Sequence, residues 1–256
     1  MLIAVDIGNT ETNIGVFDGE ELKATWHVAT VVHRTADEHA IQLLGLLESR
    51  GLKSGDITKV SMCSVVPQMT PVFIEMFKQY LDIPPLVVAA GIKTGMRICM
   101  DNPKEVGADR IADAVAAHQL YGSPVIVVDL GTATTFDTVS KDGDYIGGAI
   151  APGMLTAAEA IFQKAAMLPH IELTRPARAI GTNTIDAMKS GIVFGYVALV
   201  EGMVARIQKE LGTKVKVVAT GGFSHMIAGE TKVIDEVNPN LTLIGLRLIH
   251  RMNQPA

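Results

Sequence analysis

The chain contains the same short pattern twice, and this repeat limits the folds that the sequence can adopt. Residues 2–6 and 125–129 are apolar runs that end in an aspartate, Asp6 or Asp129. Each aspartate precedes one apolar residue, a glycine and a cluster of hydroxyl or amide side chains. Such apolar runs are typical of buried strands, and a glycine at the strand end allows a tight turn. We therefore expect two similar half-domains that face one anionic ligand, and we predict a nucleotide site.

The remaining pattern favours an α/β fold with two related lobes and mixed β-sheets flanked by helices. Each opening strand is followed by a predicted hairpin and then by helices and strands. Thr35 and Glu38 have the spacing of a capping box, and Gly51 is suited to end the helix that they begin. Residues 185–211 predict one long helix or a broken pair. We place the lobe boundary near Pro124, giving lobes of residues 1–122 and 123–256, so the predicted final helix (241–252) falls in the second lobe.

Composition excludes several classes of function. The chain has 22 basic and 27 acidic residues, a formal net charge of −5, which argues against nucleic acid as the main partner. Its two cysteines, Cys63 and Cys99, are expected to be buried free thiols in a reducing compartment. No targeting signal is predicted at the start, and the most apolar stretch, residues 191–200, is shorter than the ~20 residues of a spanning helix. We expect a soluble cytoplasmic protein with no membrane partner.

The two Asp–Gly turns carry the groups that ATP and Mg²⁺ require. Carboxylates are hard oxygen ligands for Mg²⁺, and Asp6 and Asp129 supply them, with Asp6 as the candidate Mg²⁺ ligand. Hydroxyl, amide and backbone N–H groups can hold phosphate oxygens; the candidates are Asn9, Thr10, Asn13 and Thr132. The chain has no Gly-x-x-x-x-Gly-Lys-Ser/Thr motif, so it is not a P-loop protein. The glycines of Thr220-Gly221-Gly222 either form a plain turn or pack against the nucleoside.

A third aspartate is the candidate catalytic group. Asp109 lies in Gly107-Ala108-Asp109-Arg110 at the start of a predicted helix. An acidic residue there is either a helix cap or a base that accepts the proton of a substrate hydroxyl, while Arg110 contacts an anionic group. Phosphoryl transfer needs little beyond positioning, charge neutralisation and an aligned nucleophile. The seven histidines show no metal-ligand spacing.

Small residues at helical spacing suggest a helix-packing surface. Gly191, Gly195, Ala198 and Gly202 are three or four residues apart, so on a helix they form a smooth ridge. Such a ridge allows another helix to approach closely, and it indicates tight packing or a dimer interface.

Eight motifs, in order along nearly the whole chain, resemble type III pantothenate kinase. They are DIGNT (6–10), RTADE (34–38), CSVVP (63–67), GIKTG (91–95), NPKEVGADR (102–110), DLGTATTF (129–136), GGAIAPG (147–153) and TGGF (220–223). The resemblance implies the two-lobed, ribonuclease-H-like fold of the acetate and sugar kinase, Hsp70 and actin superfamily. It also implies transfer of the ATP γ-phosphoryl group to pantothenate, the first step of coenzyme A synthesis, by a homodimer.

The resemblance also implies roles for individual residues. Asp109 corresponds to the proton acceptor for the pantothenate hydroxyl, and Asp129 to the ligand of a monovalent cation, K⁺ or NH₄⁺. Thr184 corresponds to a pantothenate contact made across the dimer. The implied ATP-binding residues are Asp6, Ile7, Gly8, Asn9, Thr10, Glu11, Thr12, Asn13, Thr132 and Gly221. The implied pantothenate-binding residues are Met100, Gly107, Ala108, Asp109, Arg110 and Thr184.

The chain departs from the family pattern at four positions. Met100 replaces a usual Tyr in the substrate wall, and His27 replaces a usual Arg. Asp113 and Glu11 stand where Asn is common. Met100 leaves open a kinase for a related small hydroxy acid. The other alternative is a non-catalytic nucleotide-binding regulator of the same fold, which the retained Asp6, Asp109 and Asp129 disfavour.

Overall fold

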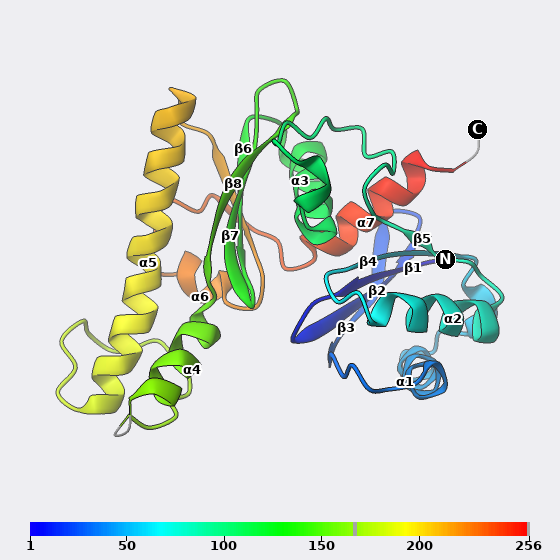
Figure 1. Cartoon of the computed structure of the whole chain (residues 1–256), viewed down its shortest axis with the longest axis horizontal. Helices are drawn as coiled ribbons and strands as arrows, with labels where there is room; N and C mark the ends of the chain where they lie inside the picture. The colour runs from blue at the N-terminus through cyan, green and yellow to red at the C-terminus, as the bar shows by residue number, and fades with distance from the viewer. Residues whose placement is uncertain (166–167, 255–256) are drawn as a thin grey trace. The chain divides into compact units, whose positions relative to one another are not determined.

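The computed structural model describes residues 1–165 and 168–254, and these residues form two compact units. The first unit comprises residues 1–97, 101–116 and 241–256, and the second comprises 98–100 and 117–240. Each unit contains one five-stranded mixed sheet (Figure 1). The sheets and their helices confirm the predicted α/β class.

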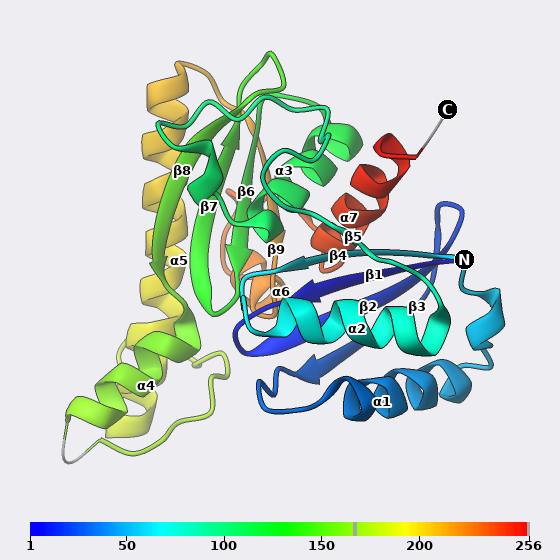
Figure 2. The same ribbon diagram turned by 45° about the vertical axis from the view of Figure 1, so that its right-hand side comes forward.

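The first sheet has the strand order β3-β2-β1-β4-β5. Its strands are β1 (Leu2–Ile7), β2 (Glu11–Asp18), β3 (Glu21–Ala29), β4 (Lys59–Ser64) and β5 (Leu86–Val87). Central strand β1 is buried along its whole length, because it pairs antiparallel with β2 and parallel with β4. Helices α1 (Ala36–Ser49) and α2 (Met69–Leu81) lie on one face of this sheet (Figure 2). Thr35 caps α1 in the predicted capping box with Glu38, and Gly51 follows its end with a positive φ.

The second sheet repeats this topology with the order β10-β9-β6-β7-β8. Its strands are β6 (Val125–Leu130), β7 (Ala133–Val139), β8 (Tyr145–Pro152), β9 (Lys216–Thr220) and β10 (Glu236–Val237). Strand β6 pairs antiparallel with β7 and parallel with β9, as β1 pairs with β2 and β4. Its helices are α4 (Met154–Lys164), α5 (Thr184–Leu211) and the short α6 (Ser224–Ala228). The predicted internal repeat is therefore present in the structure.

The final helix departs from the predicted lobe boundary. Helix α7 (Leu241–Met252) belongs to the first unit, not to the second. It packs against β1, β2 and β4, and the Ser61 hydroxyl donates to the Leu246 carbonyl at 3.0 Å. It also crosses α3 (Ala108–Tyr121) closely, since a Cβ at Gly245 would overlap the carbonyl of Ala112. A single boundary along the sequence could not place α7 in the first unit, because its place depends on packing and not on its position along the chain.

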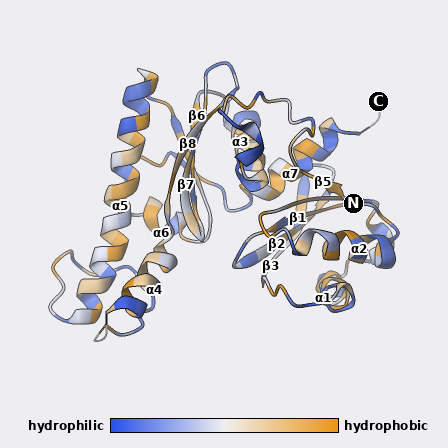
Figure 3. Cartoon of the chain, in the orientation of Figure 1, coloured by the Kyte–Doolittle hydropathy of each residue, from blue (hydrophilic) through white to orange (hydrophobic). Residues whose placement is uncertain are grey.

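Helix α5 is a single helix of 28 residues. Its length and composition alone would allow it to cross a membrane, and a third of its most apolar window is buried in the structure. The buried face includes Val193, Val197 and Val200, which belong to the core of the second unit. Figure 3 shows apolar and polar residues interspersed along the helix. The buried face identifies α5 as a core helix of its unit.

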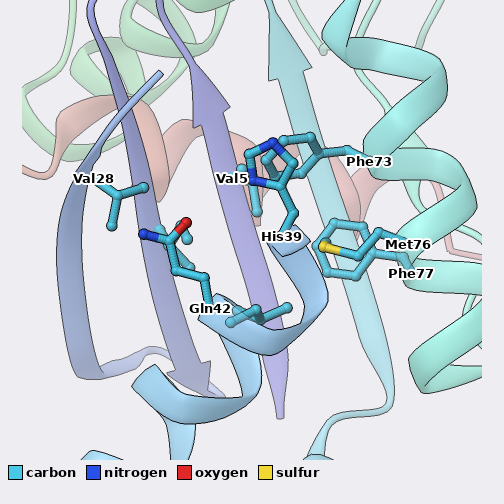
Figure 4. A pocket seen from close by; sticks show the side chains of 9 residues that line it. Val5, Val28, His39, Gln42, Phe73, Met76 and Phe77 are labelled. Atoms are coloured by element: carbon cyan, nitrogen blue, oxygen red, sulfur yellow. The ribbon is translucent and has the colours of Figure 1, made fainter. Parts of the chain in front are cut away.

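A small cavity between the first sheet and helices α1 and α2 is lined by a buried histidine, His39 (Figure 4). The cavity has a volume of about 10 Å³, which is the space of one water molecule. The His39 ring lies 4.8 Å from the Phe73 ring, and its Nε2 has no hydrogen-bond partner within the described part of the chain. Burial, followed by the charge of Arg34, lowers the pKa of His39 below its usual value, and Glu38 opposes this.

This histidine should make stability depend on pH. Its pKa is lower in the folded protein than in the unfolded chain, so the unfolded chain takes up a proton first as the pH falls below about 6.5. Its contribution to stability is therefore lost as the pH falls from neutral. In urea unfolding at pH 7.5 and pH 5.0, His39→Leu should lose less stability between these pH values than the wild type. An equal loss in both proteins would contradict the assignment.

Candidate active site

Asp6 is the penultimate residue of β1 and lies between side chains of the two neighbouring strands. The strand register pairs Asp6 with Asn13 of β2 and with Cys63 of β4. Asn13 Nδ2 donates to Asp6 Oδ2 at 3.2 Å, and Cys63 Sγ donates to Asp6 Oδ1 at 3.3 Å. Burial raises the pKa of Asp6 to about 6; the negative charge of Asp109 adds to this, and the two hydrogen bonds oppose it. A nearby cation would offset this cost of ionisation.

The turn between β1 and β2 is tight and leaves little space at Gly8. The Gly8 N–H donates to the Glu11 carbonyl at 3.0 Å, and a Cβ at Gly8 would lie only 2.8 Å from that oxygen. The hydroxyl of Thr30, the residue after β3, donates to the Gly8 carbonyl at 2.8 Å and so stabilises the turn. Asn9, Thr10 and Glu11 are exposed at the tip of the turn. The predicted ATP segment, residues 6–13, is thus one hairpin whose tip is exposed. Three of its predicted ATP-binding residues, Asp6, Ile7 and Thr12, are instead buried.

Asp109 lies in the first turn of α3 and is partly buried. Its Oδ1 accepts a hydrogen bond from the Arg110 N–H at 2.8 Å, which directs the carboxylate toward the helix start. A Cβ at Gly107 would overlap this same oxygen, so a larger residue there would displace the Asp109 carboxylate. The negative charge of Asp109 adds to the effect of burial in raising the pKa of Asp6, and both residues belong to the first unit.

The second unit brings Asp129, Thr132 and Gly221 together at the end of β6. Asp129 pairs with Thr135 of β7 and Thr220 of β9. A Cβ at Gly221, where φ is +86°, would overlap Asp129 Oδ1, so the bare backbone lies against the carboxylate. The Thr132 carbonyl accepts from the Gly153 N–H at 3.0 Å and from the Thr156 hydroxyl at 2.8 Å. These bonds fix the turn and leave the Thr132 residue exposed.

The predicted pantothenate-binding residues are divided between the units. Residues 107–110 belong to the first unit, whereas Met100 and Thr184 belong to the second. Met100 follows Cys99, whose N–H donates to the Tyr145 carbonyl of β8 at 2.7 Å. Thr184 is the exposed first residue of α5, which Asn183 caps by accepting the Asp186 N–H at 2.9 Å.

The sequence did not predict one side chain beside Asp6 or one beside Asn13, and the predicted burial of one cysteine is wrong. Cys63 contacts Asp6 directly, and His27 Nδ1 lies 2.7 Å from Asn13 Oδ1. The available signal was strand register, because residues opposite each other in neighbouring strands share a face. Both cysteines are free, but Cys99 is exposed and not buried as expected, since it lies outside the sheets on the segment that precedes α3.

A comparison with protein families decides the identity of the chain. The model of the type III pantothenate kinase family matches residues 2–206. The chain belongs to the type III pantothenate kinase family. A type III pantothenate kinase from Dehalococcoides mccartyi (strain CBDB1) is 57% identical over 99% of this chain and 96% of its own length. One from Moorella thermoacetica is 50% identical over 99% of this chain and 100% of its own.

Solved structures of other kinases share the fold. The ROK hexokinase of Thermus thermophilus matches with a TM-score of 0.51 and 15% identity, over 97% of each chain. At this low identity, the likeness shows that the chain shares the fold of this kinase and nothing further. A kinase of this family is a phosphotransferase that uses ATP with a divalent metal.

The donor sets at Asp6 and Asp129 fit cations held largely by a nucleotide. Among residues 1–165 and 168–254, no three His, Cys, Asp or Glu side chains are grouped to hold a metal ion. Mg²⁺ is usually bound through one or two carboxylates together with substrate phosphates and water. The desolvated Asp6 carboxylate beside the exposed turn of residues 8–10 matches that pattern.

Proposed function

We propose that this enzyme transfers the γ-phosphoryl group of ATP to the hydroxyl of pantothenate, giving 4′-phosphopantothenate, the first step of coenzyme A synthesis. Membership of the type III pantothenate kinase family supports this function. The observation that supports the chemistry is the position of Asp109 in the first turn of α3, in the same unit as Asp6, whose pKa its negative charge helps to raise. We infer that the Asp109 carboxylate deprotonates the acceptor hydroxyl.

Each group has a defined task in this proposal. Asp109 accepts the proton of the pantothenate hydroxyl as the phosphoryl group leaves ATP, and Arg110 binds the pantothenate carboxylate. Asn9 and Thr10 of the exposed turn, together with Thr132, donate to phosphate oxygens, and Gly221 packs against the nucleoside. Met100 and Thr184 line the pantothenate site. Phosphoryl transfer relies mainly on positioning and charge, so a carboxylate of ordinary basicity suffices.

Two cations complete the proposed site. Asp6 would hold Mg²⁺, and Asp129 would hold a monovalent cation, K⁺ or NH₄⁺. Bound there, the cations would neutralise the charge of the phosphates. We expect the enzyme to work in the cytoplasm without nucleic acid or membrane partners.

The direct test is ADP release from ATP, measured with and without pantothenate in buffer containing Mg²⁺ and K⁺. ADP formation that depends on pantothenate is expected. ATP binding without turnover would favour the regulator. Because Met100 stands at the substrate wall, related hydroxy acids should be assayed beside pantothenate. A higher kcat/KM for one of them would reassign the acceptor.

The exposed ridge on α5 supports a homodimer. Gly191, Gly195 and Gly202 are exposed, and a Cβ at any of them would meet no atom within 4 Å. Ala198 is exposed between them. We expect the wild type to have twice the chain mass by light scattering. Gly195→Arg should yield a monomer with reduced activity, because Thr184 is proposed to act across the dimer.

Gly195→Ala is the matched control for this prediction. It adds a small side chain to an exposed helical position where alanine is favoured over glycine by about 1 kcal/mol. The alanine variant should therefore remain dimeric and active. A dimer that persists in Gly195→Arg would place the interface elsewhere.

A further inference from the structure

The Asp6 carboxylate is held from both sides by hydrogen bonds that the proposed chemistry does not use. One carboxylate oxygen accepts from Asn13 Nδ2 at 3.2 Å and the other from Cys63 Sγ at 3.3 Å. The donors come from different strands on opposite sides of β1. A carboxylate bonded at both oxygens cannot turn about its own axis without breaking one bond.

Cys63 is suited to this role because it is buried and remains a thiol. The residue is wholly buried in β4. The residue is a free thiol, and its Sγ donates to Asp6 Oδ1 at 3.3 Å.

Asn13 is itself oriented by a third residue. His27 Nδ1 lies 2.7 Å from Asn13 Oδ1. The amide oxygen is an acceptor, so Nδ1 must carry a proton. This contact keeps the Asn13 oxygen toward His27 and its amino group toward Asp6. If the amide turned over, its oxygen would face the carboxylate and the hydrogen bond to Asp6 would be lost.

The second unit has different side chains at the corresponding positions. Thr135 and Thr220 occupy the positions beside Asp129 that Asn13 and Cys63 occupy beside Asp6. There the Thr135 hydroxyl donates to Asp137 at 2.8 Å. The residue at the Asn13 position of the second unit therefore donates to a different carboxylate.

We propose that Cys63 and Asn13 are positioning residues that fix the Asp6 carboxylate for the metal–nucleotide complex, and that His27 fixes the Asn13 amide. The inference rests on the proposed role of Asp6 in binding Mg²⁺ with ATP. Each donor uses one lone pair of one carboxylate oxygen, so each oxygen keeps a further lone pair for a cation or its bound water. Without them, the carboxylate must be ordered when the nucleotide binds, and that cost weakens binding.

The test measures binding of MgADP by calorimetry in the absence of pantothenate, together with the KM for MgATP. Cys63→Ala should weaken MgADP binding about tenfold, equivalent to about 1.4 kcal/mol, and should raise the KM for MgATP with little change in kcat. Cys63→Ser keeps a donor and should bind within about twofold of the wild type. His27→Ala should weaken binding severalfold, and His27→Asn, whose amide can replace Nδ1, should restore it.

Ser61→Ala provides the matched control on the same strand. Ser61 is wholly buried in β4 and donates to Leu246, not to Asp6. This variant should lose stability but keep its affinity for MgADP. Unchanged affinity for MgADP in Cys63→Ala would overturn the inference. An equal loss of affinity in Cys63→Ala, Cys63→Ser and Ser61→Ala would also overturn it, because that pattern is expected when only packing is disturbed.

The outcomes separate this inference from the proposed function. If the wild type binds MgADP but does not phosphorylate pantothenate, the function is wrong while the affinities still decide the clamp. If it phosphorylates pantothenate and the variants bind as the wild type does, only the clamp is wrong. His27 is exposed, so its two variants provide the test even if Cys63→Ala does not fold.

Discussion

Replacing Asp109 with Asn should lower the kcat for pantothenate phosphorylation by roughly 10²- to 10⁴-fold, the usual contribution of a general base. The amide cannot accept the hydroxyl proton. Its oxygen can still accept from the Arg110 N–H, as Asp109 Oδ1 does at 2.8 Å, so the start of α3 should be preserved. Steady-state kinetics with pantothenate and MgATP would measure the loss.

Two further measurements separate this result from misfolding. Binding of MgADP should be retained, because the variant removes a negative charge near Asp6. The pKa of Asp6, followed by carbon NMR, should fall from about 6, since repulsion by Asp109 contributes to raising it. An Asp109→Asn enzyme that turns over at the wild-type rate would end the assignment of Asp109 as base.

Replacing Asp6 with Asn should have opposite effects on activity and stability. Activity should fall at least 10²-fold, because the proposed Mg²⁺ ligand is lost. The protein without nucleotide should become more stable at pH 8. The pKa of this buried group is raised from 3.8 to about 6, so its ionisation at pH 8 destabilises the folded state by about 3 kcal/mol. The asparagine variant avoids this cost but loses one hydrogen bond, which reduces its gain in stability by about 1 kcal/mol.

The pH dependence gives the sign of this effect. The folded pKa of Asp6 lies above the unfolded value, so between about pH 4 and pH 6 the folded protein binds the extra proton. The contribution of Asp6 to stability is full below this range and is lost as the pH rises through 6. Urea unfolding of wild type and Asp6→Asn should therefore differ most above pH 7 and converge near pH 4. A variant less stable than the wild type at pH 8 would show that Asp6 stabilises the fold.

Much of the fold could be predicted because its signals are local. The apolar runs before Asp6 and Asp129 become the central strands β1 and β6, and the capping box at Thr35 begins α1 as expected. The same signals could not assign α7 to its unit. Its place depends on the close crossing at Gly245, a packing feature that leaves no trace in hydrophobic periodicity.

The candidate site divides in the same way. Residues 6–13 and 107–110 are contiguous segments whose residue types suggest phosphate and hydroxyl chemistry, so they could be named from the sequence. Cys63 and His27 could not, because their relation to Asp6 and Asn13 exists only once β1, β2, β3 and β4 are placed in register. A thiol in an apolar run and a histidine in a hairpin are more often packing or surface residues.

The most direct test of the proposed function is the identity of the product. Phosphorus NMR of a reaction containing the wild-type enzyme, pantothenate, ATP, Mg²⁺ and K⁺ should show a new phosphomonoester on the pantothenate hydroxyl. This signal should grow in step with ADP. Release of ADP with inorganic phosphate alone, or no ADP at all, would contradict the account.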